Sequence, residues 1–356
     1  MSDSRLPSVE VAGTWAEMGE QVGRAFSKLI RGHIEAWLEH VHKQTKASRQ
    51  TILSAANTFA PPIKDHAPFL WEELLGISRG SGATVPEILL LQARAEVMRI
   101  CRKRAAPDNL DNECTLFAVC GNRVKNGGVL MGQNVDLMPF IREFTVVVRQ
   151  RSEEKPAAII CTSAGLLGQN GINETGVGVC ASFIDDPEGW GDGMPRYLLS
   201  RLVLAEESTG NAVQAVFKPP RAASRNLLIA DSSGDCVDVE LLAREAALLR
   251  TENNLLIHAN HLEAPEFQGR EEPNENSLLR RKRIQALFEN AESLIDISDI
   301  QHLLRDHGNT PNSLCAHPFE GRNIETVAAV IGNLTEKSFY VCKGPPCRGR
   351  FEKFSF

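Results

Sequence analysis

The chain changes from polar to apolar at Asp111-Asn112-Glu113-Cys114-Thr115-Leu116-Phe117-Ala118-Val119-Cys120. The second half of this stretch is an apolar run with the composition of a buried β-strand. A cut between Glu113 and Cys114 would make Cys114 a new N-terminus that carries a thiol and a free α-amine. Because an α-amine has a pKa near 7.7–8.0, it can serve as the base that a thiol nucleophile needs. The stretch therefore predicts a strand that begins at a nucleophilic cysteine.

Taken alone, Cys114 is more simply a small buried residue at the head of a strand. The chain on its N-terminal side changes that interpretation. Residues 14 to about 101 have helical periodicity, and a four-residue repeat of apolar positions from Met18 to Leu38 predicts one long helix. Thr84-Val85-Pro86-Glu87 predicts a capping box. Residues 103–112 are polar and contain Pro107, so we expect an exposed linker, where cleavage is best tolerated.

The chain after Cys114 is rich in short predicted strands joined by turns. Asn126-Gly127 is a hairpin signal, and residues 168–171 predict a bend. Runs of strands at this spacing favour antiparallel sheets. Strands are predicted at 116–120, 129–131, 144–148, 157–162, 177–183, 226–230, 236–241, 246–249, 255–258, 326–331 and 338–342, and helices at 195–207, 211–217, 277–290 and 298–306.

Two polar motifs are candidates for the nucleophile's partners. Gly132-Gln133-Asn134-Val135-Asp136 follows Cys114 by one hairpin, so Asp136 is a candidate to orient the α-amine; the alternative is a residue that only caps a turn. Leu255-Leu256-Ile257-His258-Ala259-Asn260-His261 is an apolar strand that ends in polar residues. The amide N–H of Asn260 is a candidate oxyanion donor.

No metal site or cofactor is predicted. His258 and His261 are three residues apart in an extended segment, so they do not share a face, and no CxxC or HExxH motif is present. The segment 312–318 is interpreted as either a pocket lining or an ordinary loop. Cys342 and Cys347 flank a glycine-proline turn and are interpreted as incidental thiols rather than a disulfide or a metal clip.

Composition limits the function further. The 356 residues carry a formal net charge of -6, and the densest basic run, Arg280-Arg281-Lys282-Arg283, is interpreted as a solvated helix face rather than a nucleic-acid surface. No apolar stretch reaches the ~18 residues of a membrane span. Residues 1–5 lack the apolar core of a signal peptide, and nine scattered cysteines predict free thiols, so the expected compartment is the cytoplasm.

These motifs resemble, in order, those of the acyl-coenzyme A:6-aminopenicillanic acid acyltransferase family, which is peptidase family C45 of the N-terminal nucleophile (Ntn) hydrolases. The resemblance rests on Cys114-Thr115, Gly-Gln-Asn-x-Asp, His-x-Asn-His and a final Gly-Pro-Pro-Cys. It implies an α+β fold, a four-layer αββα sandwich of two antiparallel sheets with an N-terminal helical segment. It also implies self-cleavage before Cys114 into chains 1–113 and 114–356 that remain associated, the second forming the catalytic αββα chain.

The resemblance assigns Cys114 as nucleophile, Asp136 as support for its amine and Asn260 as oxyanion donor. Three departures from the family accompany it. Glu113 stands where glycine is frequent, and Ala316 stands where the penicillin enzyme has arginine, with His317 as the candidate substitute. The third departure is in the strand 177–183, where Ser182 is a candidate for the hydroxyl that replaces a family asparagine. We also expect His261 to line the pocket.

The predicted function is a self-processing thiol amidohydrolase or acyltransferase that acts on a small-molecule acyl amide or acyl thioester. One alternative is an uncleaved thiol hydrolase in which Cys114 pairs with His258, His261 or His317. Another is a catalytically silent relative that binds a small ligand.

Overall fold

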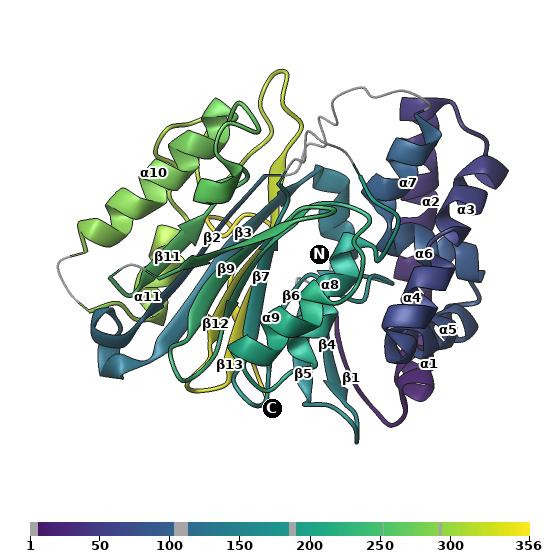
Figure 1. Ribbon diagram of the computed structural model, residues 1–356, viewed down its shortest axis with the longest axis horizontal. Coiled ribbons are helices and arrows are strands. Elements are labelled where there is room, and N and C mark those ends of the chain that lie inside the picture. Colours follow the sequence, from purple (N-terminus) through teal and green to yellow (C-terminus); the bar gives the residue numbers. More distant parts are fainter. Residues whose placement is uncertain (1–5, 103–112, 185–189, 252, 292–293) are drawn as a thin grey trace.

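The computed structural model describes residues 6–102, 113–184, 190–251, 253–291 and 294–356. The predicted linker at 103–112 and the N-terminal residues 1–5 lie outside these ranges. The N-terminal part is largely helical and packs on one side of the molecule (Figure 1). Its helices are α1 (Trp15–Ala25), α2 (Ser27–Thr45), α3 (Arg49–Asn57), α4 (Ala60–His66), α5 (Pro68–Ser81), α6 (Val85–Gln92) and α7 (Arg94–Cys101).

Helix starts in this part follow the local sequence. Thr84 caps α6, because its backbone N–H and its hydroxyl both donate to the Glu87 carboxylate, as the capping box predicts. The apolar repeat from Met18 to Leu38 is divided between α1 and α2, which meet at Phe26. The single long helix predicted there is therefore wrong, although its buried stripe continues across the break.

An eight-stranded sheet forms one inner layer. Its strands lie in the order β1-β4-β5-β6-β7-β8-β9-β10, and all neighbouring pairs are antiparallel except β1 and β4, which run parallel. Helices α8 (Arg196–Leu204) and α9 (Thr209–Phe217) cover its outer face (Figure 1). The strands are β1 (Ser8–Ala12), β4 (Thr145–Arg151), β5 (Ala158–Ser163), β6 (Asn170–Asn173), β7 (Gly178–Ser182), β8 (Arg225–Ala230), β9 (Cys236–Leu241) and β10 (Ala246–Arg250).

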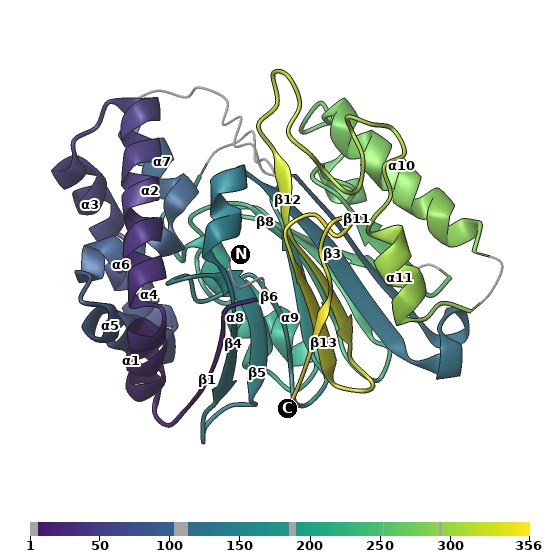
Figure 2. The same cartoon turned by 180° about the vertical axis from the view of Figure 1, so that it is seen from behind.

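A six-stranded antiparallel sheet forms the second inner layer, in the order β11-β2-β3-β12-β13-β14. Helices α10 (Glu275–Glu289) and α11 (Ile297–Leu303) cover its outer face, as Figure 2 shows from behind. The four layers confirm the predicted αββα sandwich. The strands are β11 (Leu255–His258), β2 (Glu113–Cys120), β3 (Val129–Leu137), β12 (Glu325–Asn333), β13 (Ser338–Lys343) and β14 (Glu352–Ser355).

Alternation along β2 divides its side chains between two cores. Phe117 and Val119 pack with Ile284 and Phe288 of α10 on the outer side. Leu116 and the other even-numbered residues face the eight-stranded sheet in the main core. The thiol of Cys114, which has the same parity, therefore lies between the two sheets.

Three strands differ from the expectations. Residues 168–171 were expected only to bend, yet β6 begins at Asn170, and neither β1 nor β14 has a predicted counterpart. Because β1 comes from the N-terminal part, that part contributes an edge strand to the eight-stranded sheet. Within the described ranges, no helix combines the length and the apolar character needed to cross a bilayer.

Candidate active site

Cys114 is the second residue of β2 and is buried. The ladder between β2 and β11 pairs Leu116 with His258, so Asn260 is the residue that would next lie opposite Cys114. The backbone hydrogen bonds between β2 and β11 end before this point, and the side chain of Asn260 bonds to the backbone of Cys114 instead. The Cys114 backbone N–H donates to Asn260 Oδ1 over 2.7 Å.

Asn260 is held on several sides. Its Nδ2 donates to the Phe183 carbonyl over 2.9 Å, and its backbone N–H donates to Ser277 Oγ over 2.8 Å. Since an amide nitrogen carries two hydrogens, Phe183 accepts one of them. Asn260 is thereby fixed beside the nitrogen of Cys114 by groups from two other segments, with Phe183 holding its side chain and Ser277 its backbone.

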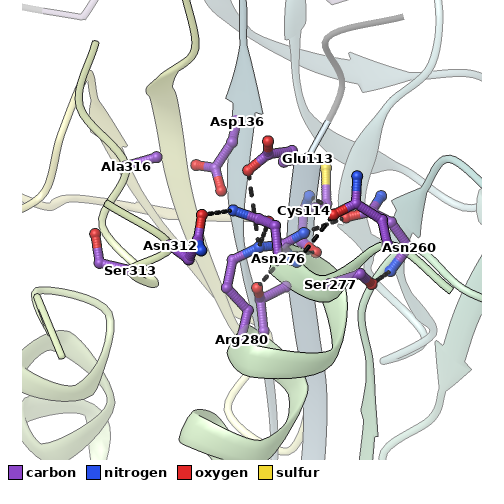
Figure 3. Close-up of polar contacts among 12 residues, drawn as sticks. Glu113, Cys114, Asp136, Asn260, Asn276, Ser277, Arg280, Asn312, Ser313 and Ala316 are labelled. Carbon is purple, nitrogen blue, oxygen red and sulfur yellow. Dashed lines mark hydrogen bonds and ion pairs between the residues drawn. The ribbon is translucent and has the colours of Figure 1, made fainter. Parts of the chain in front are cut away.

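Arg280 of α10 joins these groups, and its side chain is fully buried (Figure 3). Its Nη1 donates to the Cys114 carbonyl oxygen and, over 2.8 Å, to Thr115 Oγ1. Its Nη2 donates to Asn260 Oδ1 over 2.8 Å, and its Nε donates to Asn276 Oδ1 over 2.7 Å. The interpretation of the run 280–283 as a solvated helix face is therefore wrong for Arg280.

Glu113, which precedes Cys114 across the predicted cleavage bond, forms an ion pair with Arg322. Its carboxylate accepts hydrogen bonds from Nε, over 2.9 Å, and from Nη2 of Arg322. Arg280 Nε lies 3.8 Å from Glu113 Oε2. The two arginines neutralise the acidic side chain that precedes Cys114, and they fix the residues on both sides of the Glu113–Cys114 bond.

Asp136 lies opposite Glu113 in the β2–β3 ladder and is fully buried. Its Oδ1 accepts a 2.6 Å hydrogen bond from Thr326 Oγ1, whereas no hydrogen bond to its Oδ2 is found within the described part of the chain. Burial raises the pKa of Asp136 to about 7, although the nearby Arg280 guanidinium and the Thr326 hydroxyl oppose this rise. In the intact chain, the Cys114 nitrogen thus bonds to Asn260, while Asp136 is held by Thr326.

The thiol of Cys114 lies in an apolar, partly cationic environment. Burial raises its pKa to about 11, and the Asp136 charge adds to that rise, while Arg225 and the Gln133 side chain oppose it. Gln133 also exchanges two hydrogen bonds with the Ala181 backbone, at 2.9 and 3.0 Å, and so joins the two sheets. The hydroxyl of Ser182 is buried, without a hydrogen bond to any described group.

Three buried arginines, Arg94, Arg196 and Arg225, surround Tyr197. Their guanidinium carbons lie 4.4, 5.6 and 4.8 Å from the centre of its ring. In each of them the buried Nε lacks a hydrogen-bond partner within the described residues. Glu96 brings one buried carboxylate to the same ring, so the three arginines retain an excess of positive charge, which suits a further anion.

The three candidate histidines have other partners. His258 Nε2 lies 2.9 Å from Glu240 Oε1; burial alone would lower its pKa, but Asp238 and Glu240 raise it to about 10. His261 Nδ1 lies 2.7 Å from Ser277 Oγ, and burial lowers its pKa to about 4. His317 lies near Cys315 and Cys347. In the described residues, no hydrogen bond joins any of them to Cys114.

Arg280 and Arg322 are the site residues that the sequence interpretation missed. Ala316, which was expected to stand in place of a family arginine, contributes its backbone N–H, which donates to Thr326 Oγ1 over 2.9 Å. The segment 312–318 is attached to α10, since Asn276 Nδ2 donates to Asn312 Oδ1 over 2.6 Å. Arg280 lies on the buried stripe of α10, where Ser277, Arg280, Ile284 and Phe288 follow one another at spacings of three or four residues. This periodicity is the signal that identifies Arg280.

Comparison with known sequences decides the family. The profile described as Acyl-coenzyme A:6-aminopenicillanic acid acyl-transferase matches residues 123–346. The chain belongs to this family. The predicted resemblance is confirmed, and so is the prediction of an enzyme of this acyltransferase family.

A relative in this acyltransferase family comes from Emericella nidulans (strain FGSC A4) and is named acyl-coenzyme A:6-aminopenicillanic-acid-acyltransferase 40 kDa form. It is 23% identical over 321 residues, which cover 88% of this chain and 86% of the relative. Two solved structures are more distant. Penicillin V acylase from Agrobacterium tumefaciens has a TM-score of 0.44 at 16% identity, covering 65% of this chain and 83% of its own. A mutant of conjugated bile acid hydrolase from Clostridium perfringens has a TM-score of 0.43 at 14% identity, covering 68% and 97%.

Proposed function

We propose that this protein is a self-processing N-terminal-cysteine enzyme that cleaves or transfers an acyl group at an amide or thioester bond of a small molecule. The observation that carries the proposal is the 2.7 Å hydrogen bond from the Cys114 nitrogen to Asn260 Oδ1. It fixes the atom that becomes the α-amine. Family membership supports the acyl chemistry, and the absence of a histidine contact to Cys114 among the described residues favours the amine as base.

Self-cleavage would begin with attack of the Cys114 thiol on the Glu113 carbonyl carbon. The C–N bond then breaks, the nitrogen takes up the thiol proton, and Glu113 is left as a thioester on Cys114. Water hydrolyses that thioester, which releases the Glu113 carboxylate and the free thiol. The acid side chain of Glu113 does not oppose this step, because Arg322 and Arg280 neutralise it.

Turnover would use the groups that cleavage creates. The intact thiol has a pKa of about 11 and stays protonated at neutral pH, so it needs a base. The new α-amine supplies it within the same residue. The thiolate attacks the acyl carbon of the donor, the leaving amine or thiol takes the proton, and the acyl group stays on sulfur as a thioester. Water or an acceptor amine then removes it.

Three residues would support these steps. Asn260 would hold the α-amine through Oδ1 and donate its second Nδ2 hydrogen to the oxyanion. Arg280, bonded to Asn260 Oδ1 and to the Cys114 carbonyl, would be a positioning residue that replaces the cation missing at Ala316. Asp136 would add a negative charge that favours the protonated amine.

The arginine cluster of Arg94, Arg196 and Arg225 supports a donor that carries a negative charge. Arg225 is close enough to the thiol for its charge to oppose the rise in the Cys114 pKa. A screen of acyl amides and acyl thioesters should therefore pair each neutral acyl chain with a carboxylate-bearing one of equal length. Equal turnover of both would remove the preference for an anion and leave the nucleophile assignment intact.

Intact mass and N-terminal sequencing test the proposal, with the parent protein beside Cys114→Ala. We expect two chains from the parent, one of which starts Cys-Thr-Leu-Phe, and a single chain from the variant. The parent should also become acylated on Cys114 by an activated ester. An uncut parent chain would overturn the α-amine mechanism, and cleavage in the variant would show that another agent cuts the chain.

A further inference from the structure

Four side chains from three separate segments converge beside the site. His307 follows α11, Cys315 and His317 lie in the next loop, and Cys347 lies in the turn after β13. One ligand atom from each lies within 4.8 Å of the other three. His317 Nε2 is 3.1 Å from His307 Nε2, 3.7 Å from Cys315 Sγ and 3.4 Å from Cys347 Sγ.

We propose that these four residues bind a structural zinc ion. In a tetrahedral site with Zn–N near 2.0–2.1 Å and Zn–S near 2.3 Å, neighbouring ligand atoms lie about 3.3–3.8 Å apart. The distances from His317 Nε2 to the two sulfur atoms, 3.4 and 3.7 Å, lie within this range, and its 3.1 Å distance to His307 Nε2 is slightly shorter. A set of two thiolates and two imidazoles is typical of zinc.

The proton balance is simple, and no redox step is needed. Zinc binds two thiolates and two neutral imidazoles, so the thiols of Cys315 and Cys347 release their two protons to solvent. Four protein ligands fill a tetrahedral shell and leave no position for substrate, which makes the site structural rather than catalytic. His307 is exposed and the other ligands except Cys315 are partly exposed, so the ion can enter from solvent.

The zinc ion would stabilise a loop that contacts the active site. Between two of its ligands, Ala316 N–H donates to Thr326 Oγ1, and that hydroxyl donates to Asp136 Oδ1. Arg305 Nε donates to the Pro346 carbonyl over 2.9 Å, which places the loop and the C-terminal turn together. The metal would add a further connection between these two segments.

The proposal departs from the expectation that no metal is bound. Cys347 was paired in sequence with Cys342 across the Gly-Pro-Pro turn, but Cys342 Sγ points to carbonyls of its own turn, Lys343 O at 4.0 Å and Gly344 O at 3.9 Å. The other three proposed zinc ligands lie about thirty to forty residues from Cys347 along the chain. This spacing matches none of the short metal-binding motifs.

The test measures metal on the full-length protein, purified in reductant without chelator. We expect about one zinc ion per chain by mass spectrometry of metal content. Replacement of zinc by Co²⁺ should give the visible d–d bands and thiolate charge-transfer band of a tetrahedral site. Cys347→Ala and His307→Ala should each weaken zinc binding, measured against a chromogenic chelator, by at least about tenfold, since loss of an outer-shell partner alone costs that much.

Cys101→Ala and His302→Ala are the matched controls, because Cys101 lies on α7 and His302 is exposed on α11. Both should bind zinc as the parent does. A parent that takes up neither Zn²⁺ nor Co²⁺ in reductant overturns the proposal, even if the variants fail to fold. So does a Cys315–Cys347 disulfide that persists in reductant, identified by peptide mapping of the purified protein.

Discussion

Asn260 is the residue on which turnover should depend most directly after Cys114. Removing one oxyanion donor typically costs about 2.7–4 kcal/mol, so Asn260→Ala should lower kcat by about 10²–10³. The measurement is hydrolysis of a p-nitrophenyl ester by the processed enzyme, with the extent of cleavage recorded by mass. Asn290→Ala, at an exposed helix end, is the control and should leave kcat unchanged. A normal rate in Asn260→Ala would exclude Asn260 from the mechanism.

Asp136 should make stability depend on pH. Its pKa in the folded chain is about 7, above its ordinary value of 3.8, because burial disfavours the charged form. A raised carboxyl pKa means that ionisation destabilises the fold, so its contribution is most favourable below about pH 4 and is lost as the pH rises to about 7. Asp136→Asn keeps the shape and the Thr326 contact but cannot ionise. As the pH rises from about 4 to about 7, we therefore expect the variant to become more stable relative to the parent, by a few kcal/mol of unfolding free energy.

The comparison is best made in the Cys114→Ala background, where the chain stays intact and the charges around Asp136 are those described: Glu113, Arg280 and Arg322. Melting temperatures from pH 4 to pH 8 give the difference between variant and parent. Asn290→Ala, at the exposed end of α10, neither adds nor removes an ionisable group and should give a constant difference. A constant difference for Asp136→Asn as well would mean that the buried carboxyl titrates as it does in water.

The sequence could predict only some of the residues that form the candidate site. Cys114 and Asn260 were predicted because each stands at one end of an apolar run, and Asp136 because its polar motif follows Cys114 by one hairpin. The structure brings Cys114 and Asn260 into contact. Arg280 was missed because the residues that follow it, Arg281-Lys282-Arg283, are also basic. All four were therefore assigned to one solvated helix face. Pairings such as Glu113 with Arg322, 209 residues apart, depend on the tertiary fold alone.

At the scale of elements, α1 and α5 cross so closely that only glycine fits at the contact. A Cβ on Gly76 would lie 2.2 Å from the Ala16 carbonyl oxygen, and one on Gly19 would lie 2.1 Å from the Glu73 carbonyl oxygen. Gly76→Ala should therefore force the helices apart and lower the unfolding free energy by about 1–3 kcal/mol. Thermal or urea unfolding measures this loss.

Gly210→Ala in α9 is the matched control, because nothing lies within 4 Å of its added Cβ. There alanine should stabilise the protein by about 0.4–1 kcal/mol through the unfolded chain. Equal effects at Gly76 and Gly210 would mean that helix propensity, rather than the close crossing, decides both.

The periodicity of apolar residues predicted most helices and strands, because an element that is buried on one face repeats apolar residues at a fixed spacing. It fails where an element is short or at an edge. β1 and β14 lie at the ends of their sheets, and β6 has four residues and two glycine- or asparagine-rich flanks. Such strands exist because a neighbouring strand offers hydrogen bonds. For β1 that neighbour is β4, more than a hundred residues away, whereas β6 and β14 pair with strands adjacent in sequence and are simply too short for a repeat to show.

At the scale of the whole molecule, the segments before and after Cys114 form one packed body. Glu73 of α5 pairs with Arg201 of α8 over 2.8 Å, with both side chains buried. Gln92 Nε2 donates to the Gly165 carbonyl over 2.7 Å, and β1 completes the eight-stranded sheet. The apolar side chains of α1 and α5 belong to the same buried core as the strands that follow Cys114. Separation would expose this apolar surface, at roughly 25 cal/mol per Å², so it would be strongly unfavourable.

We therefore expect chains 1–113 and 114–356, once formed, to stay together in solution. Size-exclusion chromatography of the processed protein should give a single peak that contains both masses in equal amounts, at the elution volume of uncut Cys114→Ala. Urea should separate them only at concentrations that also unfold the sheets, as followed by circular dichroism. Elution of the helical chain alone in native buffer would contradict this, and it would mean that the buried contacts of α5 and β1 are lost when the chain is cut.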